Sequence, residues 1–192
     1  MGTIRQYATA LRFLIALTVI TGFLYPAVIF AAGQLAFKNQ AQGSLVSMNG
    51  KVVGSSLIGQ NFAGSQWFHS RPSGAGADGY DALSSAATNA GPNEPSLEAT
   101  VKSRRATVAA EEGVDLSLVP PDAITTSASG LDPEISPAYA YLQVKRVAVN
   151  RNIAEGTLNA LVESHIQSRT FGFMGEPRVN VLELNIALSS LK

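Results

Sequence analysis

The stretch FLIALTVITGFLYPAVIFAAG, residues 13–33, decides how this chain is organised. Its 21 residues carry no charge. A helix rises about 1.5 Å per residue, so about 20 apolar residues are enough to cross the hydrocarbon core of a bilayer. The stretch therefore predicts one membrane-spanning helix. A cleaved secretory signal is the alternative, although its apolar run is usually shorter, at about 7–15 residues.

Charges on either side of this stretch predict its orientation. Arg5 and Arg12 precede it, and Lys38 is the nearby cation that follows. Cytoplasmic flanks carry the excess of Lys and Arg, so we expect the N-terminus in the cytoplasm and the rest of the chain on the other side of the membrane. The predicted divisions are a short cytoplasmic N-terminus (1–12), a transmembrane helix (13–37) and a globular, extracytoplasmic domain (38–192).

The predicted span also carries the residues that we expect to pack on other membrane helices. Small residues let helix backbones approach closely, and glycine and proline are tolerated within membrane helices. The predicted packing residues are Gly22, Tyr25, Pro26 and Gly33.

Composition excludes several classes of function. Charged residues make up 15% of the chain, against about 25% in an average soluble domain, and the formal net charge is zero. A neutral chain offers no electrostatic footprint for nucleic acid. The sequence has no cysteine, which excludes thiol catalysis, disulfides and cysteine metal sites.

Turn and cap signals divide the rest of the chain into short elements. Asn49–Gly50 between two apolar runs predicts a β-hairpin. Pro95 and Gly113 suit the start and end of a helix over 95–112, and Ser136 suits the cap of a second helix that runs to about Asn150. The remaining predicted elements are a short strand over 123–128, a helix over 153–168 capped by Asn152, and a central strand over 179–188. Together they predict a mixed α+β domain.

A long segment without clear periodicity, Gln66–Pro95, is rich in Gly, Ala and Ser. Such a composition is typical of linkers. Large aromatic side chains are unusual in linkers, however, and long loops inside compact domains are often functional. We therefore expect an ordered functional loop, and its candidate residues are Trp67, His69, Arg71, Tyr80, Asp81 and Asn89.

No catalytic motif stands out in this sequence. It has no phosphate-binding loop of the GxxxxGK[ST] type, and its two histidines lie outside any metal-ligand spacing, so we expect neither a metal site nor a catalytic residue. The polar group of interest is Tyr139, Gln143, Arg146 and Asn150, spaced for one helix face. An amide and a guanidinium on one face can bind a phosphate or a base edge, or form a subunit contact.

Several long segments resemble the C-subunit family of the Kdp potassium-transporting ATPases. The similar segments are GSSLIGQNF (54–62), WFHSRPS (67–73), VPPDAITTSASGLDPEISP (119–137), QVKRVA (143–148) and GEPRVNVLELNIAL (175–188). The resemblance implies an accessory subunit without catalytic activity of its own. Its partners would be a channel-like potassium-translocating subunit, a P-type ATPase subunit and membrane lipid, and potassium would be the ion that the complex transports.

The resemblance also implies a role in raising ATP affinity, with Gln143 as the nucleotide-binding glutamine and Arg146 beside it. That role conflicts with the predicted orientation, because ATP is scarce outside the cell. We expect no firmly bound cofactor and give the orientation more weight than the ATP role. A membrane-anchored module that binds a small ligand outside the membrane is the alternative function.

Overall fold

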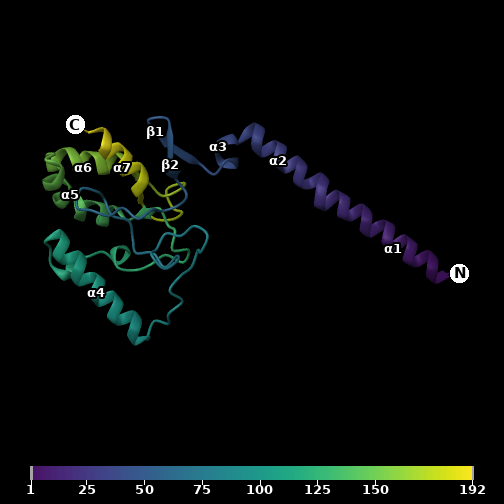
Figure 1. The fold of residues 1–192 in the computed structure, drawn as a ribbon, viewed down its shortest axis with the longest axis horizontal. Coiled ribbons are helices and arrows are strands. Elements are labelled where there is room, and N and C mark those ends of the chain that lie inside the picture. Colours follow the sequence, from purple (N-terminus) through teal and green to yellow (C-terminus); the bar gives the residue numbers. More distant parts are fainter. Residues whose placement is uncertain (1, 192) are drawn as a thin grey trace. The chain divides into compact units, whose positions relative to one another are not determined.

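The computed structural model describes residues 2–191, which divide into two units. The first unit ends at Leu45 and the second begins at Val46. The elements of the first unit are α1 (Gly2–Val19), the π-helical turn η1 (Ile20–Leu24), α2 (Tyr25–Ala36) and α3 (Lys38–Ala41). Figure 1 shows α1 and α2 as one continuous helical rod. At 35 residues this rod, Gly2–Ala36, is long and apolar enough to cross a membrane, as predicted.

The π-helical turn has a local cause. Pro26 has no N–H to donate, and its ring collides with the carbonyl of the residue four positions earlier. The backbone responds by widening the preceding turn, where the N–H of Tyr25 donates to the carbonyl of Ile20, five residues back. Gly22 lies within this turn and Tyr25 and Pro26 follow it; all three residues are exposed, as is most of the rod.

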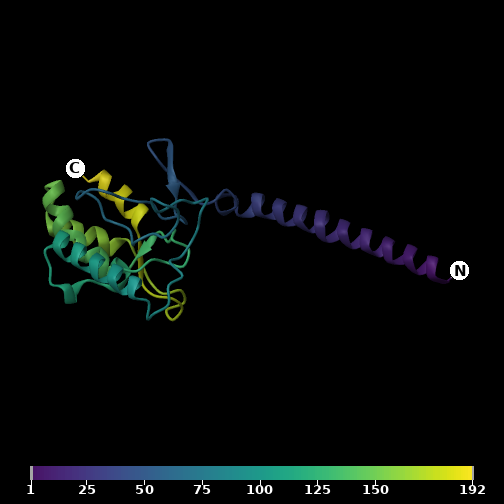
Figure 2. The same cartoon turned by 60° about the horizontal axis from the view of Figure 1, so that its bottom comes forward.

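The second unit contains helices and small antiparallel sheets, so the predicted α+β class is confirmed. Its hairpin consists of β1 (Leu45–Met48) and β2 (Lys51–Ser55), and Figure 2 shows it projecting from the unit. Asn49 and Gly50 form the turn with φ of 52° and 76°, as predicted. A three-stranded sheet has the order β3-β5-β4, with β5 (Arg178–Asn180) between β3 (Glu134–Ile135) and β4 (Ile166–Gln167).

Helix α5 (Pro137–Arg151) lies at the centre of the unit. Figure 1 shows it between α4 (Pro95–Glu112) and α6 (Glu155–Ser164), with α7 (Val181–Ser190) beside α6. Two short 3-10 helices, η2 (Leu116–Leu118) and η3 (Pro121–Ala123), follow α4. The core joins side chains of all four helices, the central strand and the long loop; its fully buried members include Phe68, Val147, Leu158, Val162, Val179, Leu184 and Leu188.

The predicted caps of α4 and α5 are confirmed. Gly113 ends α4 in the left-handed conformation at φ 64°. Ser136 caps α5 by accepting a hydrogen bond from the N–H of Tyr139. Both positions relieve backbone groups that a helix end leaves without partners.

Three predictions of secondary structure were wrong. The segment predicted as a strand over 179–188 forms only the end of β5 and then α7, whose N-cap Asn180 accepts from the N–H of Glu183. Asn152 does not start α6; at φ 54° it ends α5, and α6 begins at Glu155. The predicted strand over 123–128 is instead the end of η3 and irregular chain, because Pro120 and Pro121 start a 3-10 turn there.

Candidate functional site

The long loop is ordered because side chains of two helices bind its backbone directly. Asn185 of α7 accepts from the N–H of Phe68 at 3.0 Å and donates to its carbonyl at 2.9 Å. Gln143 of α5 accepts from the N–H of His69 at 2.6 Å and donates to the carbonyl of His69 at 3.2 Å. Each side-chain amide thus replaces the backbone partner that a neighbouring strand would supply. Phe68 and His69 are held as a neighbouring strand would hold them, although they belong to no sheet.

Arg146 completes this binding of the loop. Its Nη1 donates to the carbonyls of Ser65 at 2.8 Å and Trp67 at 2.9 Å. Its Nη2 donates to Oε1 of Gln143 at 2.8 Å, and its Nε to Oε1 of Glu112 at 2.9 Å. We call Gln143, Arg146 and Asn185 the clamp. All three are buried, with exposed fractions of 0%, 9% and 2%.

Glu112, at the end of α4, supplies the charge that balances Arg146. Its side chain is 1% exposed, and its Oε2 has no hydrogen-bond partner among the described residues. Burial raises the pKa of Glu112, and the positive charge of Arg146 opposes that rise. A buried carboxylate with one free oxygen is costly unless its ion pair is maintained. The clamp and α4 therefore depend on each other.

The edge of the clamp is closed by Arg151 at the end of α5. Its guanidinium lies 4.3 Å from the centre of the Trp67 ring. Its Nε also donates to the carbonyl of Gln66 at 3.1 Å. A cation over an indole face is favourable, so Trp67 contributes to fixing the loop.

A cavity of about 550 Å³ lies beside the clamp and brings together three of the predicted loop residues, His69, Arg71 and Tyr80. Tyr139 and Glu111 also line it. Burial, followed by the charge of Arg146, lowers the pKa of His69, so its ring is neutral at pH 7. Its Nε2 lies 3.0 Å from the carbonyl of Gly64, which can only accept, so Nε2 carries the proton. Burial likewise raises the pKa of Tyr139.

Arg71, which also lines this cavity, is held by other groups of the chain. Its Nη1 forms an ion pair with Asp132 at 2.7 Å. Its Nε and Nη2 both lie 3.4 Å from the carbonyl of Thr125. The Tyr80 hydroxyl donates to the backbone carbonyl of Arg71. These contacts fix the shape of the loop around the cavity.

The remaining predicted site residues lie elsewhere. Asp81 and Asn89 are exposed and do not line the cavity; Asp81 accepts from the N–H of Leu83, and Asn89 has a positive φ of 51°. On the face predicted for α5, Asn150 accepts from the Ser65 hydroxyl at 2.7 Å. Gly33 belongs to the apolar rod of the first unit.

Sequence reasoning missed two residues of this site. Glu112 follows the buried Val108 by four residues, so its position on the inner face of α4 was visible in the pattern. Asn185 lies three residues before the buried Leu188. This spacing indicates a shared face only in a helix, and the segment had been predicted as a strand.

Within residues 2–191 no group of three or more potential metal-ligating side chains comes together. The polar side chains that line the cavity are those of Asn61, His69, Ser70, Arg71, Ser73, Asp78, Tyr80, Glu111 and Tyr139. Side chains of these types can bind or position a polar ligand through hydrogen bonds and charge.

Comparison with known proteins gives a consistent result. Residues 7–190 match the family described as "K+-transporting ATPase, c chain". A protein of Gemmatimonas aurantiaca is 52% identical over 92% of this chain and 88% of its own, and one of Kineococcus radiotolerans is 50% identical over 97% and 94%. A third, of Methylococcus capsulatus, is 45% identical over 98% of this chain and 100% of its own. All three are named potassium-transporting ATPase KdpC subunit.

Proposed function

This chain belongs to the KdpC family of potassium-transporting ATPase subunits, and from that premise we propose that it is an accessory subunit that assembles and stabilises its complex without catalysing a reaction itself. As a family member it is a component of a potassium-transport complex. The proposed partners are a channel-like potassium-translocating subunit and a P-type ATPase subunit. The observation that carries the proposal is the family match from residue 7 to residue 190, which includes both the apolar rod and the domain.

The proposed route of assembly is packing of the rod on membrane helices of the partners. Gly22, Pro26 and Gly33 expose backbone that a neighbouring helix can approach. The widened turn at Ile20–Leu24 adds a local irregularity to this surface, and such turns are frequent at functional sites.

We expect Gly33→Leu to weaken assembly by about 1–3 kcal/mol, because the added side chain separates two packed helices. In this chain alone the new Cβ meets only Ala41 Cβ at 3.9 Å, an ordinary contact, so the domain should unfold at an unchanged temperature. The measurement is recovery of the partner subunits with the tagged chain from detergent extracts, beside thermal unfolding of the chain.

Ala31→Leu is the matched control. Two residues earlier in α2, it lies on nearly the opposite side of the helix and adds similar bulk. It should leave recovery of the partners unchanged. Equal loss of the partner subunits with both variants would contradict a specific packing face. So would a domain whose unfolding temperature falls together with the recovery of partners.

We propose further that the second unit lies on the outer side of the bacterial inner membrane. The excess of Arg5 and Arg12 over Lys38 supports this orientation. The ATP role also stays a proposal, because both polar atoms of the Gln143 side-chain amide are engaged. Its Oε1 accepts from the N–H of His69 and from Arg146, and its Nε2 donates to the carbonyl of His69. A nucleotide would have to displace the loop to reach them.

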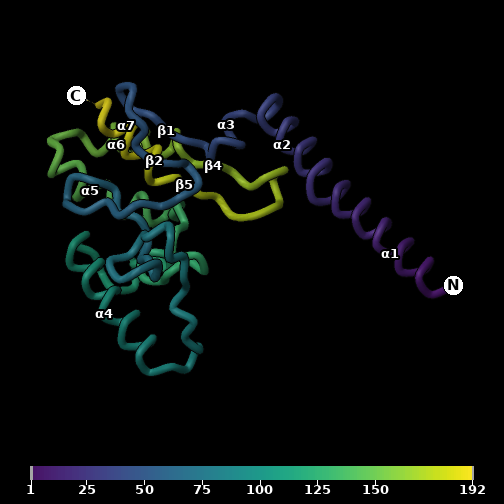
Figure 3. Tube along the Cα trace, turned by 45° about the vertical axis from the view of Figure 1, so that its right-hand side comes forward, coloured from purple at the N-terminus to yellow at the C-terminus, as the bar shows by residue number. Residues whose placement is uncertain are grey.

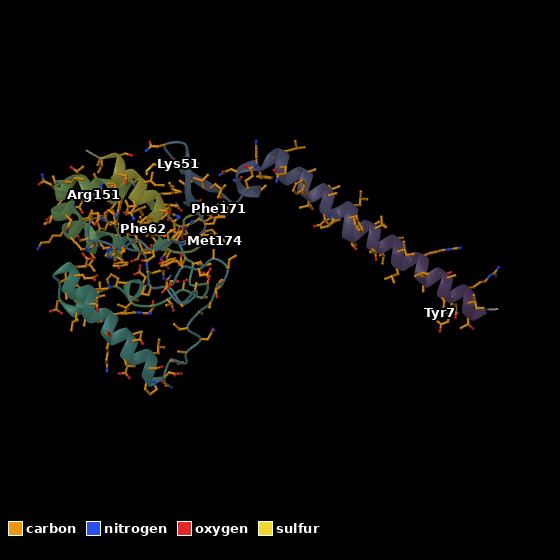
Figure 4. The ribbon with its side chains drawn as sticks, viewed as in Figure 1. Tyr7, Lys51, Phe62, Arg151, Phe171 and Met174 are labelled. Atoms are coloured by element: carbon orange, nitrogen blue, oxygen red, sulfur yellow. The ribbon has the colours of Figure 1, made fainter. Side chains whose placement is uncertain are left out.

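The orientation can be tested with a single introduced cysteine, since the chain has none. Lys51 at the start of β2 is exposed and adjoins the hairpin turn, and Figure 4 labels it. Asn49 and Gly50 have positive φ and are unsuitable for a cysteine. We expect Lys51→Cys to react with a membrane-impermeant maleimide in intact cells, while Gln6→Cys reacts only after lysis. The reverse pattern would place the domain inside and favour the ATP role.

A second candidate function, a membrane-anchored module that binds a small ligand, is supported by the cavity beside the clamp. Tyr139, which is only 3% exposed, lines this cavity together with His69 and Arg71. Recovery of the chain without any ATPase subunit from native membranes would favour this function over the first.

A further inference from the structure

A short hairpin of residues 169–176 follows β4 in the second unit and carries exposed aromatic side chains. Phe171, Phe173 and Met174 at its tip are 83%, 73% and 51% exposed. Figure 3 shows the hairpin, in yellow-green, projecting clear of the rest of its unit, and Figure 4 shows Phe171 and Met174 at the surface. Large apolar side chains gathered on one exposed turn usually mark an interaction surface.

Internal hydrogen bonds make this hairpin rigid. The N–H of Thr170 donates to the carbonyl of Met174 at 2.9 Å, and the N–H of Met174 donates back at 3.0 Å. The N–H groups of Gly172 and Phe173 donate to carbonyls within the turn at 3.0 Å and 3.3 Å. An ion pair between Arg169 and Glu176, at 2.5 Å, closes the base. The hairpin therefore displays its apolar side chains without an entropy cost of ordering on binding.

The backbone geometry supports a function in display. Phe171 has φ of 53°, a left-handed conformation that costs a residue with a side chain about 1–2 kcal/mol. The turn holds this conformation although the Phe171 ring packs against nothing in its own chain that would repay the strain, since it is 83% exposed. Strain of this kind is found most often at functional sites.

We propose that the 169–176 hairpin inserts its tip into the interfacial region of the lipid bilayer. Residues 170–175 carry no charge, and the N–H groups of Thr170, Gly172, Phe173 and Met174 are bonded within the hairpin. Both properties are required of a segment that leaves water for lipid, where a backbone polar group without a partner is costly. The aliphatic stem of Arg169 can lie along the lipid while its guanidinium stays at the headgroups.

The short segment between the apolar rod and the second unit favours lipid as the binding partner of the hairpin tip. Only residues 37–44 separate the end of the apolar rod at Ala36 from β1. Eight residues reach at most about 28 Å when fully extended. If the rod spans the bilayer, the second unit stays at the membrane surface, and lipid is the apolar phase always within reach. This inference rests on the rod as an anchor and not on the identity of the partner subunits.

The test uses the full chain reconstituted into vesicles of phosphatidylcholine and phosphatidylglycerol. Phe173→Cys is labelled with an environment-sensitive NBD fluorophore, and Leu83→Cys, on a loop tip where the native side chain is 99% exposed, is the matched control. We expect a blue-shifted emission at position 173 and loss of emission when shallow nitroxide-labelled lipids are present. The label at position 83 should show neither change.

Met174→Cys, labelled in the same way, guards against a local disturbance at position 173. Emission at both positions that matches the water-exposed control would overturn the proposal. Shielding that is seen only when partner subunits are added, without quenching by nitroxide lipid, would also overturn it and would assign the hairpin to a protein contact.

Discussion

Replacing Arg146 by Met should lower the free energy of unfolding by about 3–5 kcal/mol, the usual cost of leaving one partner of a buried ion pair alone. Glu112 would then be a carboxylate with 1% of its side chain exposed and no counter-charge. The carbonyls of Ser65 and Trp67 would lose their donor in the same step. Met keeps most of the volume of the Arg side chain. The decrease in the free energy of unfolding therefore comes mainly from lost hydrogen bonds and charge and not from a new cavity.

The experiment is urea unfolding of the full chain in mild detergent, followed by the fluorescence of Trp67. This is the single tryptophan of the chain, and its carbonyl accepts from the clamp. Lys145→Met, on the exposed side of the same helix, should change stability by less than about 0.5 kcal/mol.

A double variant separates charge from shape. Glu112→Leu combined with Arg146→Met removes both charges, and replacement of a buried ion pair by apolar residues is often neutral. We expect the double variant to be more stable than Arg146→Met alone. A loss below about 1 kcal/mol in the single variant would show that the clamp does not hold the loop.

Gly130→Ala is the second change for which we expect a large loss, of about 2–5 kcal/mol. Gly130 has φ of 69°, and a Cβ there would lie 2.6 Å from the carbonyl oxygen of Ala86 and 2.7 Å from the backbone nitrogen of Ala75. These neighbours are backbone atoms of the long loop and cannot rotate away. Relief requires that the loop itself move.

Gly113→Ala is the control that isolates this steric contribution. Its φ of 64° is nearly the same, but nothing lies within 4 Å of the added Cβ. It should therefore lose only the conformational part, about 1–2 kcal/mol. Urea unfolding of both variants measures the difference, and equal losses would contradict the close packing of residues 75 and 86 on Gly130.

Local signals predicted the apolar helix, the β1–β2 hairpin and the ends of α4, because each is decided by residues next to one another. Asn49–Gly50 needs no distant partner to form its turn, and Gly113 ends its helix by its own conformation. The segment after Arg178 could not be assigned in this way. Its dense apolar residues suit a central strand, but the spacing of Val181, Leu184, Asn185 and Leu188 is that of a helix face.

The site was only partly predictable for a related reason. The spacing on α5 indicated that Gln143 and Arg146 share a face, and three of the loop residues do meet at one cavity. The hydrogen-bond partners of the loop, however, lie far away in the sequence. Phe68 is 117 positions from Asn185, and Gln143 is 74 positions from His69. No local pattern encodes such pairings.

The clamp has a consequence for how this loop can change over evolution. Gln143, Arg146 and Asn185 recognise residues 65–69 through main-chain atoms, which every amino acid except proline presents alike. An exposed position such as Gln66 can therefore be substituted without loss of these contacts. The three helical side chains that bind the backbone of its neighbours cannot. The same interaction would then let the side chains of the loop change and keep the three helical side chains constant. The exposed surface of the loop could change in this way while the contacts that hold its backbone stay the same.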